Sequence, residues 1–241
     1  MTYCVGLLLD AGIVLLSDTR TNAGMDDIST FRKMFVFEEP GERVIAMMTS
    51  GNLSVTQTVL AKLQHEIERV EATPETSIMQ AETMLDVAEI VGRTLFEVSM
   101  SIRARMKQMG QTASASFLLG GQRKGGRMRL FHIYREGNFI EATEDTPFLQ
   151  IGEHKYGKPI LDRAVFHGTD LYDALKIALI SMDSTMRSNL SVGLPIDIAV
   201  VRRDAIRPEL VHRIEVGEPY FHDLRERWST ALRAAHMAIP A

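Results

Sequence analysis

Short apolar runs separated by polar turns dominate the first fifty residues. Four such runs are predicted strands: Tyr3–Leu9, Ile13–Thr19, Met34–Glu38 and Val44–Thr49. The segments 10–12 and 39–42 carry Gly, Pro and acidic residues, which are typical of tight turns. Because the runs are almost entirely apolar rather than alternating, we expect both faces of these strands to be buried. Their spacing predicts that the four strands form one antiparallel sheet.

Helical periodicity follows. Leu60, Leu63, Ile67 and Val70 recur at intervals of three and four residues, and Thr73-Pro74 marks a break. A second apolar stripe then begins at Met84 and continues for five turns to an end near Gly110. The pattern therefore predicts two long amphipathic helices between about residues 53 and 109.

The second half repeats this plan of strands followed by helices. The predicted strands are Ser114–Leu119, Met128–Tyr134, Asn138–Ala142, Phe148–Ile151, Pro195–Arg202 and Leu210–Val216. The predicted helices are Lys158–Phe166, a helix capped by Thr169 and running through Leu171 and Met182, and a final helix with Phe221, Leu224, Trp228 and Leu232 on one face. Runs of strands followed by runs of helices argue against a doubly wound parallel sheet. We expect an α+β protein, a four-layer αββα sandwich of two antiparallel sheets flanked by helices, in one domain spanning residues 1–241.

Composition narrows the possible functions. The 241 residues are 45% hydrophobic and 24% charged, with a formal net charge of −4, so neither disorder nor a basic nucleic-acid surface is indicated. Cys4 is the single cysteine, and the seven histidines lack metal-binding spacing. We expect no cofactor and no metal. No apolar run is long enough to span a bilayer, and the first residues lack a secretory signal pattern. We therefore expect a soluble, cytoplasmic protein.

The first residues contain the strongest candidate for chemistry. Thr2 follows Met1, and a small second residue is the context in which the initiator methionine is removed. Removal leaves Thr2 with a free α-amine, whose ordinary pKa near 8 makes a useful fraction of it neutral at pH 7. A threonine hydroxyl needs an adjacent base, and an N-terminal threonine carries that base on its own backbone. Thr2 is therefore a candidate nucleophile.

The residues that follow Thr2 resemble one family. Four long segments carry the resemblance: Ser17–Gly24, Ile28–Met34, Pro147–Pro159 and Ser181–Gly193. Together with the element order, they are similar to the proteasome β-type N-terminal-nucleophile hydrolases, and closest to the bacterial Anbu branch, which is related to HslV. The resemblance covers nearly the whole chain and implies the αββα sandwich expected above.

The resemblance also implies roles for particular residues. Thr2 is the nucleophile with its amine as base, Lys33 is the buried cation that lowers the pKa of the threonine hydroxyl, and Asp18 orients Lys33. The backbone N–H of Gly51 stabilises the oxyanion. Asp183 matches a further catalytic acid of the family loosely, because a longer segment separates it from Ser188 and Ser191, and Gly152-Glu153-His154 stands where the family has Gly-Ser-Gly. The expected substrate-binding residues are Thr21, Asn22, Thr49 and Leu53.

Three functions follow from the resemblance. The first is a threonine peptidase that cleaves peptides or unfolded proteins inside a self-assembled homo-oligomer, either a ring or an open helix. The second is a self-assembling structural subunit with little or no turnover, and the third is an amidase acting on small amides. The identity of any unfoldase partner stays open. Each charged residue taken alone also fits an ordinary structural ion pair.

Overall fold

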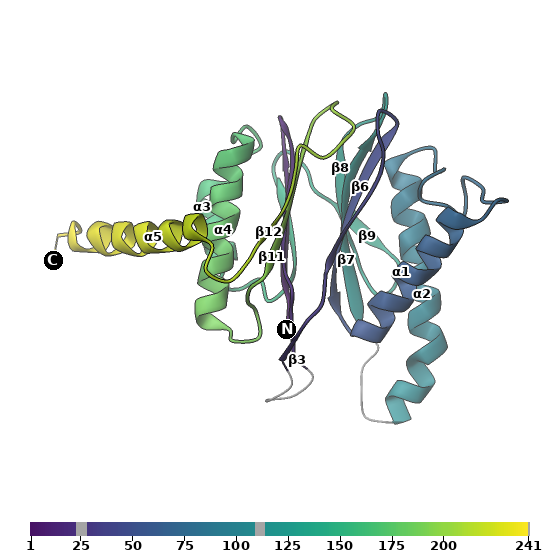
Figure 1. Cartoon of the computed structure of the whole chain (residues 1–241), viewed down its shortest axis with the longest axis horizontal. Helices are drawn as coiled ribbons and strands as arrows, with labels where there is room; N and C mark the ends of the chain where they lie inside the picture. Colours follow the sequence, from purple (N-terminus) through teal and green to yellow (C-terminus); the bar gives the residue numbers. More distant parts are fainter. Residues whose placement is uncertain (23–27, 109–113, 241) are drawn as a thin grey trace.

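The computed structural model describes residues 1–22, 28–108 and 114–240 and has four layers (Figure 1). Two sheets pack face to face. Helices α3 (Lys158–Ala164) and α4 (Leu171–Ser188) cover the outer face of one sheet, and α1 (Leu53–Glu68) and α2 (Met84–Gln108) cover the outer face of the other. The predicted αββα sandwich is therefore confirmed.

Each sheet has five strands, and every neighbouring pair within them is antiparallel. The first sheet has the order β10 (Phe148–Gly152), β1 (Tyr3–Leu9), β2 (Gly12–Asp18), β11 (Ile196–Arg202) and β12 (Leu210–Ile214). The second has the order β5 (Met34–Glu39), β6 (Arg43–Gly51), β7 (Ala115–Arg123), β8 (Arg129–Ile133) and β9 (Phe139–Glu141).

The prediction that the first four strands form one sheet is wrong. The hairpin β1–β2 belongs to the first sheet, and the hairpin β5–β6 belongs to the second. Between them the chain forms a small ribbon of β3 (Arg20–Asn22) paired with β4 (Ile28–Thr30), which the hydrophobic pattern did not predict. Turn chemistry specifies hairpins locally, but it carries no information about which sheet a hairpin joins.

Strand β1 shows why these runs are apolar throughout. All seven of its residues are buried. Tyr3, Val5 and Leu7 pack toward α3 and α4, whereas Cys4 and Leu8 pack in the core between the two sheets. The expectation of burial on both faces is confirmed for β1, because side chains alternate between two different cores.

Caps define where two of the helices begin. Asn52 caps α1 by accepting the N–H groups of Ser54 and Val55. Asp170 caps α4, instead of the predicted Thr169, whose hydroxyl accepts the N–H of Phe166. The predicted end of the second helix near Gly110 lies outside the described residues.

Helix α5 (Pro219–Met237) projects from the body of the molecule (Figure 1). Phe221 in its first turn is buried, but Leu232 is 56% exposed. The predicted helix is present, although the apolar face assigned to it is covered only near its start. Among the described residues, none of the helices combines the length and apolar character needed to cross a bilayer.

Candidate active site

Thr2 lines a pocket of about 340 Å³ and is 7% exposed. It directly precedes β1, and its carbonyl oxygen accepts the N–H of Glu153 at 2.6 Å, just beyond the end of β10. The pocket is lined by Met1, Thr2, Thr21, Lys33, Thr49, Ser50, Gly51, Leu53, Thr56 and Gly152. Segments from both sheets, from β3 and from α1 therefore meet around Thr2.

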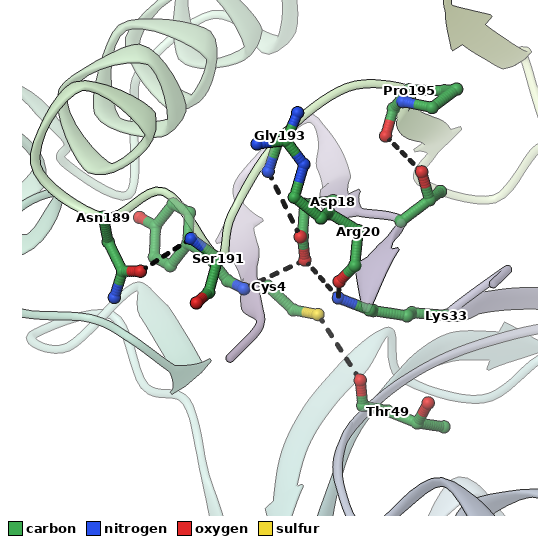
Figure 2. A network of polar contacts seen from close by, with 11 residues as sticks. Cys4, Asp18, Arg20, Lys33, Thr49, Asn189, Ser191, Gly193 and Pro195 are labelled. Carbon is green, nitrogen blue, oxygen red and sulfur yellow. Dashed lines mark hydrogen bonds and ion pairs between the residues drawn. The ribbon is translucent and has the colours of Figure 1, made fainter. Parts of the chain in front are cut away.

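A buried ion pair stands beside this pocket. The Nζ of Lys33 lies 2.8 Å from Oδ1 of Asp18, and their side chains are 6% and 0% exposed. The same Nζ donates a 2.6 Å hydrogen bond to the carbonyl oxygen of Arg20 (Figure 2). Two acceptors thus fix the position of an ammonium group that has almost no access to solvent.

The Asp18 carboxylate is held from several sides (Figure 2). Oδ1 also accepts the N–H of Tyr3 at 3.1 Å, and Oδ2 accepts the N–H of Gly193 at 3.4 Å. Burial raises the pKa of Asp18 above its usual range, while the Lys33 ammonium and these N–H groups oppose that rise. Asp18 therefore joins β2, the start of β1 and the loop before β11 around one charge.

Gly51 ends β6 in a conformation that needs glycine. Its φ is +109°, and a Cβ there would lie 2.3 Å from the carbonyl oxygen of Ser114. The absence of a side chain brings the backbone of Gly51 into the same pocket as Thr2. The structure thus places Gly51, the expected oxyanion donor, in the wall of the pocket that contains Thr2.

Three of the four expected substrate-binding residues line the pocket: Thr21, Thr49 and Leu53. Asn22 is the last residue of β3, and its side chain lies outside the described part of the chain. Sequence reasoning missed Thr56, although it follows Leu53 by three residues and so shares a face of α1. It also missed Gly152 as a wall of this pocket, because only the pairing of β1 with β10 brings Gly152 to the start of the chain.

Asp183 is not among the residues that line the pocket. It lies on α4, is 1% exposed, and its Oδ2 is 3.0 Å from Nε of Arg187. Its Oδ1 accepts from Nε of Arg225 on α5. The structure therefore does not bring Asp183 together with Thr2, because both carboxylate oxygens bind arginines that connect α4 to α5.

Met1 covers the site in this form of the chain. Its side chain lines the pocket and is 62% exposed. While Met1 is attached, the nitrogen of Thr2 is an amide and has no basic lone pair. Within the described residues, no cluster of three His, Cys, Asp or Glu side chains is arranged to hold a metal ion. The chemistry that the pocket itself offers is that of a hydroxyl beside a buried cation.

Comparisons with known proteins agree with this geometry. The proteasome subunit family matches residues 2–201. Anbu, the ancestral beta-subunit, from Yersinia bercovieri is 45% identical, with 99% of this chain and 98% of that chain covered and a TM-score of 0.91. A structure described as the helical assembly of the Anbu complex from Pseudomonas aeruginosa is 46% identical over 99% and 97% of the two chains, with a TM-score of 0.91.

An Anbu Gly-1 mutant from Hyphomicrobium sp. strain MC1 is 44% identical over 100% of this chain and 99% of that chain, with a TM-score of 0.91. A search of curated proteins finds no match. A family match over most of the chain and identities above 40% over its full length establish common descent. The chain belongs to the proteasome subunit family, with the N-terminal-nucleophile hydrolase fold, and to its Anbu branch.

Proposed function

We propose that this protein is a threonine peptidase whose nucleophile is Thr2 after removal of Met1. The observation that carries the proposal is the Lys33–Asp18 ion pair, buried beside Thr2 in a pocket that the Gly51 backbone also lines. A buried cation next to a hydroxyl favours its alkoxide form. The pocket thus combines a nucleophile, a cation and a backbone donor in one small volume.

The residues act in a definite order in this mechanism. The free α-amine of Thr2 takes the proton from Oγ, which attacks the scissile carbonyl. The N–H of Gly51 stabilises the oxyanion of the tetrahedral intermediate. The ammonium then returns its proton to the leaving amine as the C–N bond breaks, and an ester on Thr2 remains. Water, deprotonated by the same amine, hydrolyses this ester and restores Thr2.

The pocket limits which side chains of a peptide substrate can bind. Thr21, Thr49, Leu53 and Thr56 line a volume of about 340 Å³, which suits a small or medium apolar side chain of a peptide. Strand β3 provides backbone groups beside this pocket, and an extended peptide can add to such an edge. The proposed substrates are therefore peptides or unfolded proteins in extended form.

The proposed working form is a homo-oligomer in the cytoplasm. The helix α5 that stands away from the body supports self-association, as does the helical assembly described for the Pseudomonas aeruginosa relative. Head-to-tail contacts give a ring if the rotation closes and an open helix if it does not. A single buried Cys4 suits a reducing compartment.

The test uses protein released from a fusion that is cut directly before Thr2. A panel of fluorogenic peptides measures turnover, and a peptide electrophile followed by mass spectrometry measures covalent labelling of Thr2. We expect both for the native chain and neither for Thr2→Ala. Turnover that persists unchanged in Thr2→Ala, after contaminating peptidases are excluded, contradicts the proposal.

A structural subunit without turnover is the second candidate. The observation in its favour is that Asp183 binds Arg187 and Arg225 instead of completing the pocket. The same experiment separates the two functions. An assembled protein with Thr2 at its N-terminus that neither cleaves any peptide nor reacts with the electrophile supports the structural role.

A further inference from the structure

Glu153 is a buried carboxylate that the mechanism above does not use. It follows Gly152, the last residue of β10, and its side chain is 6% exposed. Its own N–H donates to the carbonyl oxygen of Thr2 at 2.6 Å. The backbone of Glu153 is therefore hydrogen-bonded to the residue that carries the proposed nucleophile.

The Thr2–Tyr3 peptide bond is held between two acidic residues. Its oxygen accepts the N–H of Glu153, and its nitrogen donates to Oδ1 of Asp18 at 3.1 Å. One loop links the two acids: Asn189 donates to Oε2 of Glu153 at 3.1 Å, and Gly193 donates to Oδ2 of Asp18. This loop, which Figure 2 shows alongside Asp18, therefore passes around the start of β1.

The two carboxylates differ in their counter-charges. Asp18 has the buried ammonium of Lys33 at 2.8 Å. Glu153 has the neutral amide of Asn189 and, at 3.6 Å from Oε1, the Nζ of Lys155, whose side chain is 68% exposed. An exposed ammonium compensates a buried carboxylate weakly, because solvent screens it. Since a carboxylate has about four acceptor positions, Glu153 can accept a further cationic donor.

Removal of Met1 creates such a cation at Thr2. We propose that Glu153 is a positioning residue for the α-amine of Thr2, which its carboxylate, oriented by Asn189, holds in the protonated form near neutral pH. This inference rests on the proposed function. In this arrangement the Asp18–Lys33 pair acts on the hydroxyl of Thr2, and Glu153 holds its amine.

The pairing has a consequence for pH dependence. A carboxylate beside an ammonium stabilises the charged form, so the neutral amine that acts as base appears only at higher pH. Charged or titratable groups on the elements around Thr2 include Asp18 from β2, Lys33 before β5, Tyr3 and Cys4 in β1, and His154 and Lys155 after β10. Arg20 on β3 donates to the carbonyl oxygen of Leu190 in the loop that also carries Asn189 and Gly193, and Asp197 on β11 pairs with Arg213. Asp18 and Lys33 compensate each other. Glu153, whose cationic partner is the exposed ammonium of Lys155, is more weakly compensated than Asp18.

The experiment measures the pKa of the Thr2 amine directly and needs no peptidase activity. Protein cut directly before Thr2 is treated with trace acetic anhydride across a pH series, and mass spectrometry gives the extent of acetylation at Thr2. We expect Glu153→Gln to lower the pKa of the amine by about one unit relative to the native chain. The matched control is Glu144→Gln, an exposed glutamate in the loop before β10, which is expected to cause no shift.

A second variant keeps the proposal testable if Glu153→Gln fails to fold. Lys155→Ala removes an exposed cation from the neighbourhood of Glu153, and we expect the amine pKa to rise by a few tenths of a unit. Equal pKa values in the native chain, Glu153→Gln and Lys155→Ala overturn the role of Glu153. A shifted amine in a protein that cleaves no peptide supports Glu153 while contradicting the proposed peptidase, so the two failures are distinguishable.

Discussion

Burial, more than distance, determines how much the Lys33–Asp18 pair contributes to the stability of the fold. Lys124 and Glu42 form an ion pair of the same 2.8 Å length, but their side chains are 65% and 51% exposed. Lys33→Ala leaves a buried carboxylate without its cation, and we expect a loss of about 3–5 kcal/mol in the free energy of unfolding. Lys124→Ala is expected to cost less than about 1 kcal/mol. Denaturant unfolding of both variants checks this, and equal losses would contradict it.

The Lys33→Ala variant has a definite pH dependence. Burial already raises the pKa of Asp18, and removal of the Lys33 cation raises it further. A folded-state pKa above the unfolded value favours folding at low pH, and this advantage is lost as pH rises through the folded pKa. The deficit of Lys33→Ala relative to the native chain should therefore shrink as pH falls through the raised pKa of Asp18. Unfolding curves over a pH series measure it, and a deficit that stays constant as the pH is lowered contradicts the prediction.

The Cys4 thiol is expected to be inert in the folded protein. Burial raises its pKa above the usual value, and its Sγ lies 3.7 Å from the carbonyl oxygen of Thr49 in the core between the sheets. Since the thiolate is the reactive form, alkylation should be far slower in the native protein than in concentrated denaturant. Labelling by iodoacetamide at mildly alkaline pH, followed by mass spectrometry, measures the two rates. Equal rates would show that β1 opens readily.

Asp183 connects α4 to α5 through its arginine partners, and removing its charge should destabilise α5. The variant Asp183→Asn weakens the contacts with Arg187 and Arg225, and we expect a loss of about 2–3 kcal/mol and faster hydrogen exchange in α5. Covalent labelling of Thr2 should stay unchanged. Asp223→Asn is the control, because that exposed carboxylate pairs within α5, with Arg227. Loss of Thr2 labelling in an otherwise folded Asp183→Asn would restore a catalytic role.

The end of β6 depends on the missing side chain of Gly51. Gly41 also has a positive φ, +82°, but no atom lies within 4 Å of the position of a Cβ there. Gly41→Ala should therefore cost about 1–2 kcal/mol, the price of the backbone conformation alone. Gly51→Ala adds a clash with Ser114, so we expect a larger loss of stability and displacement of the pocket wall. Unfolding curves for the two variants compare these costs directly.

Self-association is the prediction for the whole molecule. A helix such as α5 with Leu232 and Met237 largely exposed is stabilised poorly in a lone subunit, so we expect a homo-oligomer of at least about six subunits. Light scattering coupled to size exclusion at low micromolar protein measures the mass. A monomer over the whole concentration range would remove the enclosed peptidase and favour hydrolysis of small amides.

Local patterns in the sequence were sufficient to predict most of the helices and strands. Apolar runs and turn residues placed β1, β2, β5 and β6 within a few residues, since each hairpin depends on neighbouring positions. The Met1–Thr2 junction offered the chemistry of a candidate nucleophile, but Met-Thr is a common start, so the residues that follow and their resemblance to a family were needed to select Thr2. Asp18, Lys33 and Gly51 were named through resemblance to a family, because isolated charged residues and glycines are common in any chain.

Long-range packing decided the features that the sequence pattern did not predict. The assignment of the two hairpins to different sheets, the β3–β4 ribbon and the exposure of α5 depend on contacts between distant segments, which periodicity does not encode. The partners of Asp183 lie on α4 and α5, and the sequence pattern did not show that its carboxylate binds arginines there. Glu153 reaches Thr2 only because β10 pairs with β1. Sequence by itself therefore determined the elements and the candidate nucleophile, whereas the environment of that nucleophile arose from tertiary pairing, because electrostatic effects depend on distance and burial in space.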